Sequence, residues 1–163
     1  MGGLEPVARP DISMSDQEVA AYLGARRDAT LASVGRNGFP HQVAMWFVPQ
    51  PGRILMWTYR RSQKAVNLRR NPRASLLVQD GETYDTLRGV AVQGEVELLE
   101  DLQQVLEIGE ALQARYGAAY GDDPDAYRAT IANQAPKRVG ILLPMTEVFS
   151  WDFGKLPKSR RKG

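Results

Sequence analysis

The chain has 163 residues, of which 43% are hydrophobic and 25% charged, and this composition is typical of one globular domain. It contains no cysteine and one histidine, which excludes a disulfide framework, a thiol nucleophile and a zinc–thiolate centre, and argues against a multi-histidine metal site. Twenty-one basic and nineteen acidic residues give a net charge of +2, so the chain as a whole is not built to bind a polyanion.

The sequence has no membrane-spanning pattern. No apolar run approaches the roughly 20 residues that a membrane-spanning helix requires. The first residues lack the basic and then apolar order of a secretory signal. We therefore expect a cytoplasmic protein with no membrane partner and no bound metal.

The basic residues gather in two clusters. The first cluster contains Arg60, Arg61, Lys64, Arg69 and Arg70, and the second contains Lys155, Lys158, Arg160, Arg161 and Lys162. A basic tail can bind nucleic acid, but this one has no aromatic residues among its cations. Its composition is as typical of a disordered, solubilising end, and we expect no nucleic-acid partner.

The chain divides into three parts. Residues 1–14 predict a flexible amino-terminal arm, residues 15–153 a single domain, and residues 154–163 a basic carboxy-terminal tail. Ser15 and Glu18 have the spacing of a capping box, which predicts a short helix at the start of the domain.

Three antiparallel strands are predicted next. Residues 29–34 and 40–48 flank a turn in which Asn37-Gly38 supplies the positive φ of a hairpin, and residues 53–58 follow a second tight turn. The strand over residues 40–48 is apolar on both faces. Such a strand is expected to lie between two apolar layers.

Helices and strands alternate through the rest of the chain. Ser62 predicts the start of a short helix that runs to Arg70, because Pro72 forces the preceding residue out of helical geometry. Apolar spacing predicts further helices over residues 100–116 and 124–133. Strands are predicted over residues 74–79, 90–98, 139–143 and 146–151, with Gly94 marking a bend.

This pattern predicts a mainly β fold, a β-barrel with flanking helices. Short antiparallel strands with few helices are typical of small closed or half-closed barrels, with a β-sandwich as the competing architecture. The two-sided apolar strand favours the barrel, because one face can fill the core while the other meets a second subunit. We therefore expect a homodimer.

The junction between strand 53–58 and the following helix is the best candidate for a ligand site. There Thr58, Ser62, Arg60 and Lys64 come together with the free N–H groups of a helix start. A phosphate prefers short, charge-assisted hydrogen bonds, which lysine, arginine and hydroxyl groups donate. The pattern predicts an anion site, while a solvated basic turn with a serine cap remains the alternative.

The same segments are similar to those of a known family. They resemble the split β-barrel, FMN-binding-like flavin and deazaflavin oxidoreductases related to pyridoxamine 5′-phosphate oxidase, and most of all the actinobacterial branch that uses the deazaflavin coenzyme F420. The similarity runs over about residues 29–151, and its sharpest part is Lys64-x-x-Asn67-Leu68-Arg69-Arg70-Asn71-Pro72-Arg73. Other matching segments are 29–34, 37–41, 46–47, 57–58, 74–78 and 92–97.

The resemblance implies a homodimer with cofactor sites between subunits. It implies that Lys64 holds the cofactor phosphate with help from Thr58, Ser62 and Arg60, and that Asn67 steadies the turn or contacts the cofactor tail. His41 and Ala44 are implied to line the ring system. No catalytic acid or base is assigned, because hydride transfer from a deazaflavin requires only that the substrate be held against the ring and water be excluded.

We therefore expect an F420-dependent reductase that transfers hydride to an unsaturated small-molecule substrate. One alternative is an FMN-dependent enzyme like pyridoxamine 5′-phosphate oxidase, although we find no counterpart of the additional substrate-phosphate residues near that enzyme's carboxyl terminus. Another is a non-catalytic protein that binds F420 or another planar ligand. The substrate itself is not encoded in any single motif.

Overall fold

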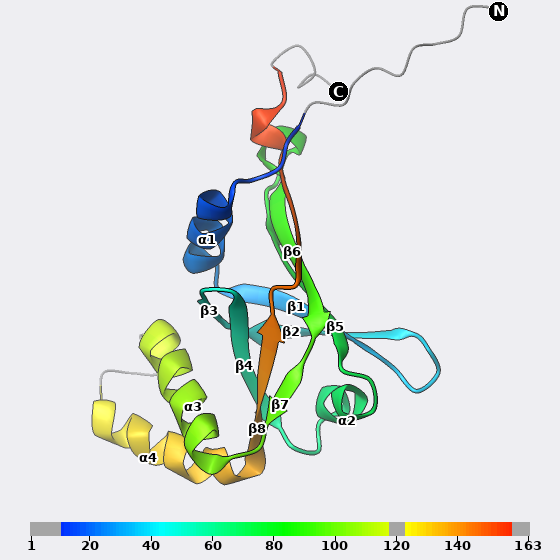
Figure 1. The fold of residues 1–163 in the computed structure, drawn as a ribbon. Coiled ribbons are helices and arrows are strands. Elements are labelled where there is room, and N and C mark those ends of the chain that lie inside the picture. Colours follow the sequence, from blue (N-terminus) through cyan, green and yellow to red (C-terminus); the bar gives the residue numbers. More distant parts are fainter. Residues whose placement is uncertain (1–10, 118–122, 158–163) are drawn as a thin grey trace, which may run out of the picture.

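The computed structural model describes residues 11–117 and 123–157 as a mainly β protein with flanking helices (Figure 1). Nine strands form two antiparallel sheets, ordered β2-β1-β5-β6-β9 and β3-β4-β8-β7. The first sheet contains β1 (Asp28–Val34), β2 (Pro40–Trp46), β5 (Arg73–Asp80), β6 (Arg88–Glu95) and β9 (Glu147–Asp152). The second contains β3 (Val48–Gln50), β4 (Arg53–Tyr59), β7 (Glu97–Leu99) and β8 (Arg138–Pro144).

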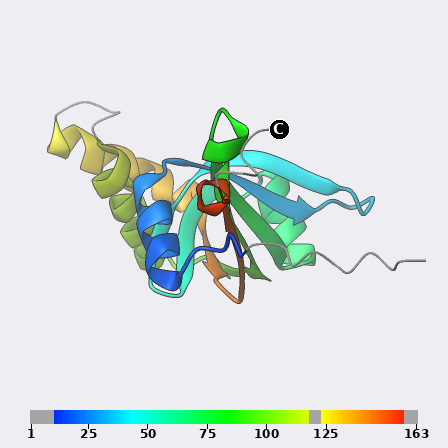
Figure 2. The same ribbon diagram turned by 90° about the horizontal axis from the view of Figure 1, so that it is seen from above.

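Within residues 11–117 and 123–157, four α-helices and three short 3-10 turns accompany the sheets. The α-helices are α1 (Asp16–Ala25), α2 (Gln63–Arg70), α3 (Leu102–Tyr116) and α4 (Pro124–Gln134). The 3-10 turns are η1 (Tyr84–Thr86), η3 (Ala135–Lys137) and η4 (Phe153–Lys155). Seen from above, α3 and α4 lie on the side of the barrel away from the projecting β1–β2 hairpin (Figure 2).

Two predicted strands are each divided in the structure. The segment 40–48 separates at Phe47 into β2 and β3, and the segment 90–98 separates at Val96 into β6 and β7. In both cases the two halves belong to different sheets, so the expectation of continuous strands was wrong. Phe47 and Val96 are buried where the chain passes between the sheets, and this exchange closes the barrel.

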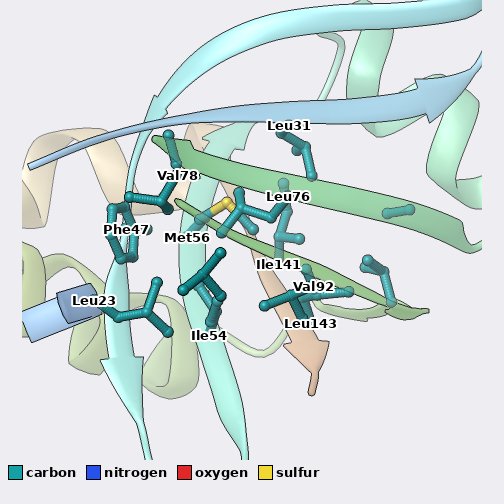
Figure 3. Close-up of a cluster of buried hydrophobic side chains, with 14 of the residues drawn as sticks. Leu23, Leu31, Phe47, Ile54, Met56, Leu76, Val78, Val92, Ile141 and Leu143 are labelled. Carbon is teal, nitrogen blue, oxygen red and sulfur yellow. The ribbon is translucent and has the colours of Figure 1, made fainter. Parts of the chain in front are cut away.

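The core fills the space between the two sheets, as Figure 3 shows. Leu31 and Leu76 from the first sheet and Met56 and Ile141 from the second are fully buried in one cluster. Gly94 lies where the turn between β8 and β9 approaches β6. A Cβ at this position would lie 2.4 Å from the carbonyl oxygen of Pro144, so a residue with a side chain does not fit there. The predicted bend is therefore a point of close backbone contact.

A second, smaller cluster attaches α3 to the outer face of the second sheet. It contains Leu55 from β4 and Ile108, Leu112 and Tyr116 from α3, with Trp57 packed against it. Since α4 packs on α3, this pair of helices forms a wall beside β4 and β8 (Figure 1).

The ends of the domain meet at β9. The Asp152 N–H donates to the Ile12 carbonyl at 2.7 Å, and Lys155 Nζ donates to Glu18 Oε2 at 2.7 Å. Residues from the expected arm and tail therefore contact the domain, while residues 1–10 and 158–163 of those segments lie outside the described residues. Among the helices of the described ranges, none is both long enough and apolar enough to cross a bilayer.

Candidate functional site

The strand-end cluster, defined here as Thr58, Ser62 and Lys64, lies where β4 ends and α2 begins. Ser62 caps α2 by accepting from the Ala65 N–H at 3.4 Å, so the turn is fixed by local sequence. Lys64 Nζ donates to Thr58 Oγ1 at 3.1 Å, and Thr58 Oγ1 lies 3.1 Å from Ser62 Oγ. The structure thus brings together three of the predicted phosphate ligands.

Lys64 is a half-buried cation. Burial, and secondarily the nearby positive charge of Arg138, hold the pKa of its ammonium group below the usual value of 10.5. In the described part of the chain no carboxylate forms an ion pair with Lys64. An anion placed at Nζ would restore the charge balance that the protein itself leaves incomplete.

Arg60 contacts main-chain groups instead of facing the cluster. Its Nε donates to the Arg138 carbonyl at 2.9 Å, and its guanidinium also donates to the Glu100 carbonyl at 3.2 Å. Arg69 binds the Arg60 carbonyl and forms an ion pair with Glu100 at 2.7 Å. These contacts connect the end of β4 to β8, so cofactor binding by Arg60 stays a prediction that requires them to rearrange.

Asn67 belongs to α2 and is fully buried. Its Oδ1 accepts from Gln63 at 2.9 Å, and its Nδ2 donates to Ser33 Oγ on β1 at 3.2 Å. Of the two roles implied for Asn67, these bonds correspond to steadying the turn, because they fix α2 on the first sheet.

His41 and Ala44 lie on opposite faces of β2, since side chains alternate along a strand. His41 lines a cavity of about 580 Å³ together with Gln63 and Asn67. Ala44 is exposed and lines a different cavity, of about 640 Å³. Within one chain the two predicted ring-lining residues are therefore not brought together.

The 640 Å³ cavity, called the aromatic pocket below, lies between β2, β4 and the helical wall. One face of α4 borders it, through Tyr127, Thr130, Ile131 and Gln134. Its other lining residues are Asp28, Ala44, Met45, Trp46, Trp57, Leu112, Asp123, Ala126 and Arg138. A flat, largely apolar molecule suits walls of this kind.

Arg138 is a site residue that sequence reasoning missed. Its guanidinium lies 4.0 Å from the ring centre of Tyr59 and 4.6 Å from that of Trp57, and it donates to Gln134 Oε1 at 2.5 Å. It borders the aromatic pocket and, through its effect on the pKa of Lys64, is electrostatically coupled to the strand-end cluster. Pairing of β4 with β8 sets Arg138 opposite Tyr59, and no local motif signals that pairing.

The two sheets, the strand exchange and the helices define a split β-barrel. The sequence profile described as pyridoxamine 5′-phosphate oxidase matches residues 15–152, and the chain belongs to this family. This confirms the expected fold class and the broader resemblance. No curated protein matches the chain in sequence.

Solved structures with the same fold include the conserved hypothetical protein Rv2991 from Mycobacterium tuberculosis. It is 41% identical, with 91% of this chain and 92% of that chain covered and a TM-score of 0.81. An F420 reductase is 24% identical, with 79% and 94% covered and a TM-score of 0.62. HutZ, a heme storage protein from Vibrio cholerae, is 18% identical, with 85% and 96% covered and a TM-score of 0.66. The last two likenesses concern the fold alone.

Proposed function

We propose that this protein is a reductase that binds the deazaflavin coenzyme F420 and delivers hydride to an electron-poor, unsaturated small molecule. The observation that supports this most directly is the strand-end cluster, in which a partly desolvated Lys64 has no acidic partner among the described residues. A phosphate is the ligand that such a cluster fits. The fold likeness to an F420 reductase is consistent with this choice.

The residues present fit a phosphorylated, planar cofactor. Lys64, Thr58 and Ser62 offer an ammonium group and two hydroxyls within one hydrogen-bonded group, and the aromatic pocket begins at the neighbouring Arg138. When bound, the deazaflavin supplies a hydride from a ring carbon. The chain's own residues have three tasks, which are to hold the phosphate, to orient the substrate against a flat surface and to exclude water.

Two other functions are candidates, because proteins that have them share their fold with this chain. A flavin-dependent oxidase or reductase is favoured by the family itself and by the likeness to a FAD-binding protein from Mesorhizobium loti. Storage of a planar ligand without turnover is favoured by the likeness to HutZ. A flavin would use both the strand-end cluster and the aromatic pocket, whereas a stored planar ligand without a phosphate would use the aromatic pocket.

Parallel titration with the deazaflavin and FMN separates these functions. We expect the deazaflavin to bind the purified protein more tightly than FMN, as measured by cofactor fluorescence. The reduced deazaflavin should then be oxidised when enones, quinones, nitroaromatics or biliverdin are added. A protein purified with tightly held flavin and insensitive to the deazaflavin would contradict the proposal, and binding without oxidation by any of these compounds would favour storage.

A homodimer is the second part of this proposal. On the outer face of the first sheet, one residue from each strand forms a row across all five strands: Ala44, Thr30, Leu77, Ala91 and Phe149. Phe149 is 52% exposed and Ala44 is exposed, whereas the three between them are half-buried. A flat row of small and apolar residues of this kind suits the same row of a second copy.

Phe149→Lys is expected to convert the dimer into a monomer, because a charge would be buried within the contact. Leu102→Lys is the matched control, since Leu102 is also an exposed apolar residue but begins α3, on the other side of the barrel. Sedimentation velocity of the three proteins measures the outcome. A monomeric wild type, or a Phe149→Lys protein that remains dimeric, would contradict this interface.

A further inference from the structure

Lys64 differs from the other lysines that the structure describes. Lys155 Nζ donates at 2.7 Å both to Glu18 Oε2 and to the Ser13 carbonyl, so its amine is held as an ammonium ion. Lys137 is exposed to solvent. Lys64 is half-buried, and no carboxylate of the described residues lies within ion-pair distance of its Nζ. It is therefore the described lysine whose surroundings favour the charged form least.

The neutral amine is the reactive form of a lysine, because its nitrogen lone pair is free to attack a carbonyl carbon. Burial and the positive charge of Arg138 lower the pKa of Lys64, so at a given pH its neutral fraction exceeds that of an ordinary lysine. A second cation beside a partly desolvated lysine is an arrangement that activates lysines as nucleophiles in enzymes.

The hydroxyl groups beside Lys64 leave its lone pair free. Lys64 Nζ donates to Thr58 Oγ1 at 3.1 Å, and Thr58 can direct its own hydrogen to Ser62 Oγ, also 3.1 Å away. Ser62 Oγ has room for this bond, because a hydroxyl oxygen accepts two hydrogen bonds and the other comes from the Ala65 N–H. A neutral amine that donates to Thr58 is thus held in position with its lone pair directed away from the hydroxyl.

We propose that Lys64 is a modification site that forms an imine with an aldehyde carrying an acidic group. The acidic group is favoured because Lys64 and Arg138 are coupled cations, and an anion beside them offsets their repulsion. The adduct would occupy the strand-end cluster, so it and a phosphorylated cofactor would exclude each other. This inference goes beyond the reductase proposal, because imine formation requires neither the deazaflavin nor hydride transfer.

The reaction is a condensation without a redox step. The Lys64 nitrogen forms a bond to the carbonyl carbon, the second electron pair of the C=O bond moves to oxygen, and one nitrogen proton is transferred to that oxygen. The resulting carbinolamine loses its hydroxyl group together with the remaining nitrogen proton as water, and a C=N bond is left. Because water is the by-product and no electrons are exchanged, no further reactant is required.

Glyoxylate, an aldehyde with a carboxylate, tests this reaction on the purified protein. Cyanoborohydride reduces an imine to a stable amine, and digestion followed by mass spectrometry then measures the modified fraction of each described lysine. We expect Lys64 to react at least about tenfold faster than Lys137 and Lys155 at pH 7. Acetaldehyde has the same number of carbon atoms but no acidic group, and its preference for Lys64 over Lys137 should be at least about threefold smaller.

Two variants and a matched control identify the groups responsible. Lys64→Arg keeps the positive charge but cannot form an imine, so the label at position 64 should disappear while Lys137 and Lys155 react as before. Arg138→Gln removes the second cation, so the preference of Lys64 for glyoxylate over acetaldehyde should decrease to that of Lys137. Arg128→Gln removes a charge that is 76% exposed and paired with an aspartate, and should leave this preference unchanged.

The labelling rates decide the inference. Equal rates at Lys64 and at the exposed Lys137 would overturn it, because the surroundings of Lys64 would then confer no reactivity. A glyoxylate preference at Lys64 that persists in Arg138→Gln would overturn it as well, because the acidic group would not be recognised by the paired cations.

Protection by the cofactor separates this inference from the proposed function. A saturating concentration of the deazaflavin should slow the labelling of Lys64 and leave that of Lys137 unchanged, because the cofactor phosphate would cover the amine. Deazaflavin that binds without protecting Lys64 would contradict the phosphate role of the strand-end cluster. If the deazaflavin does not bind, the reductase proposal fails, and selective labelling of Lys64 in the absence of cofactor still decides whether its amine is reactive.

Discussion

Replacing Lys64 with alanine is expected to weaken binding of the deazaflavin about tenfold to a hundredfold, because one charge-assisted hydrogen bond to the phosphate is lost. Thr58 and Ser62 keep their mutual hydrogen-bonding distance of 3.1 Å, so some phosphate affinity should remain. Fluorescence titration with the deazaflavin and with FMN measures the loss. The folded state should persist, because Lys64 is half-buried and its side chain donates a hydrogen bond to the hydroxyl of Thr58 alone among the described residues.

The control for this experiment is Arg53→Ala. Arg53 begins β4 at the end opposite the strand-end cluster, is exposed and binds Gln50, so its loss removes a positive charge without touching the site. Equal weakening by both variants would show that only overall charge matters. Full affinity in Lys64→Ala would contradict the phosphate role of the strand-end cluster.

The pH dependence of binding follows from the pKa of Lys64. Burial and Arg138 lower this pKa in the free protein, and a bound phosphate raises it again, so binding takes up a proton at pH values above the lowered pKa. Affinity should therefore be constant at lower pH and decrease as the pH rises through the lowered pKa toward 10.5. Lys64→Ala should lack this decrease.

Replacing Tyr116 with phenylalanine is expected to lower the free energy of unfolding by about 2 to 4 kcal/mol, because two buried main-chain groups lose their partner. The Tyr116 hydroxyl accepts from the Phe47 N–H at 3.1 Å, and it donates its one hydrogen to the carbonyl oxygen of Phe47 or of Arg27, each 2.8 Å away. Phe47 is fully buried where the chain passes between the sheets, so water cannot replace the hydroxyl there. Urea unfolding measures the change.

Tyr84→Phe is the control for the Tyr116 substitution. Tyr84 is 52% exposed and packs its ring against Phe153, and removal of its hydroxyl should change the free energy of unfolding by less than about 0.5 kcal/mol. A loss below about 1 kcal/mol in Tyr116→Phe would contradict the role given to this hydroxyl, since one unsatisfied buried group alone costs that much.

Most strands and helices could be predicted because their ends are set by local chemistry. Gly38 has the positive φ of 83° that its turn requires, and Ser62 and Asn71 bound α2 as expected. The division of strands at Phe47 and Val96 could not be predicted. Their apolar pattern continues through the break, and only the pairing of distant strands decides which sheet each half joins.

The candidate site was predictable to the same extent. Thr58, Ser62 and Lys64 belong to one continuous strand, turn and helix, so their proximity is encoded locally. Arg138 comes from the far end of the chain and reaches the site only through the pairing of β8 with β4. Arg60 matched the local pattern of a ligand, but the carbonyls that hold it come from β8 and from Glu100, which the pattern does not include.

The chain passes from β2 directly into β3 at Phe47, so these two strands join the two sheets without a loop between them. Ala44 and Trp46 on β2 border the aromatic pocket, and Ala44 also belongs to the row on the outer face of the first sheet proposed as the dimer contact, so one short segment serves both surfaces. A larger side chain at position 44 would then require changes both in the aromatic pocket and in the proposed dimer contact. Among relatives, substitutions at positions 44, 46 and 57 should consequently covary, and an alignment of the family can test this.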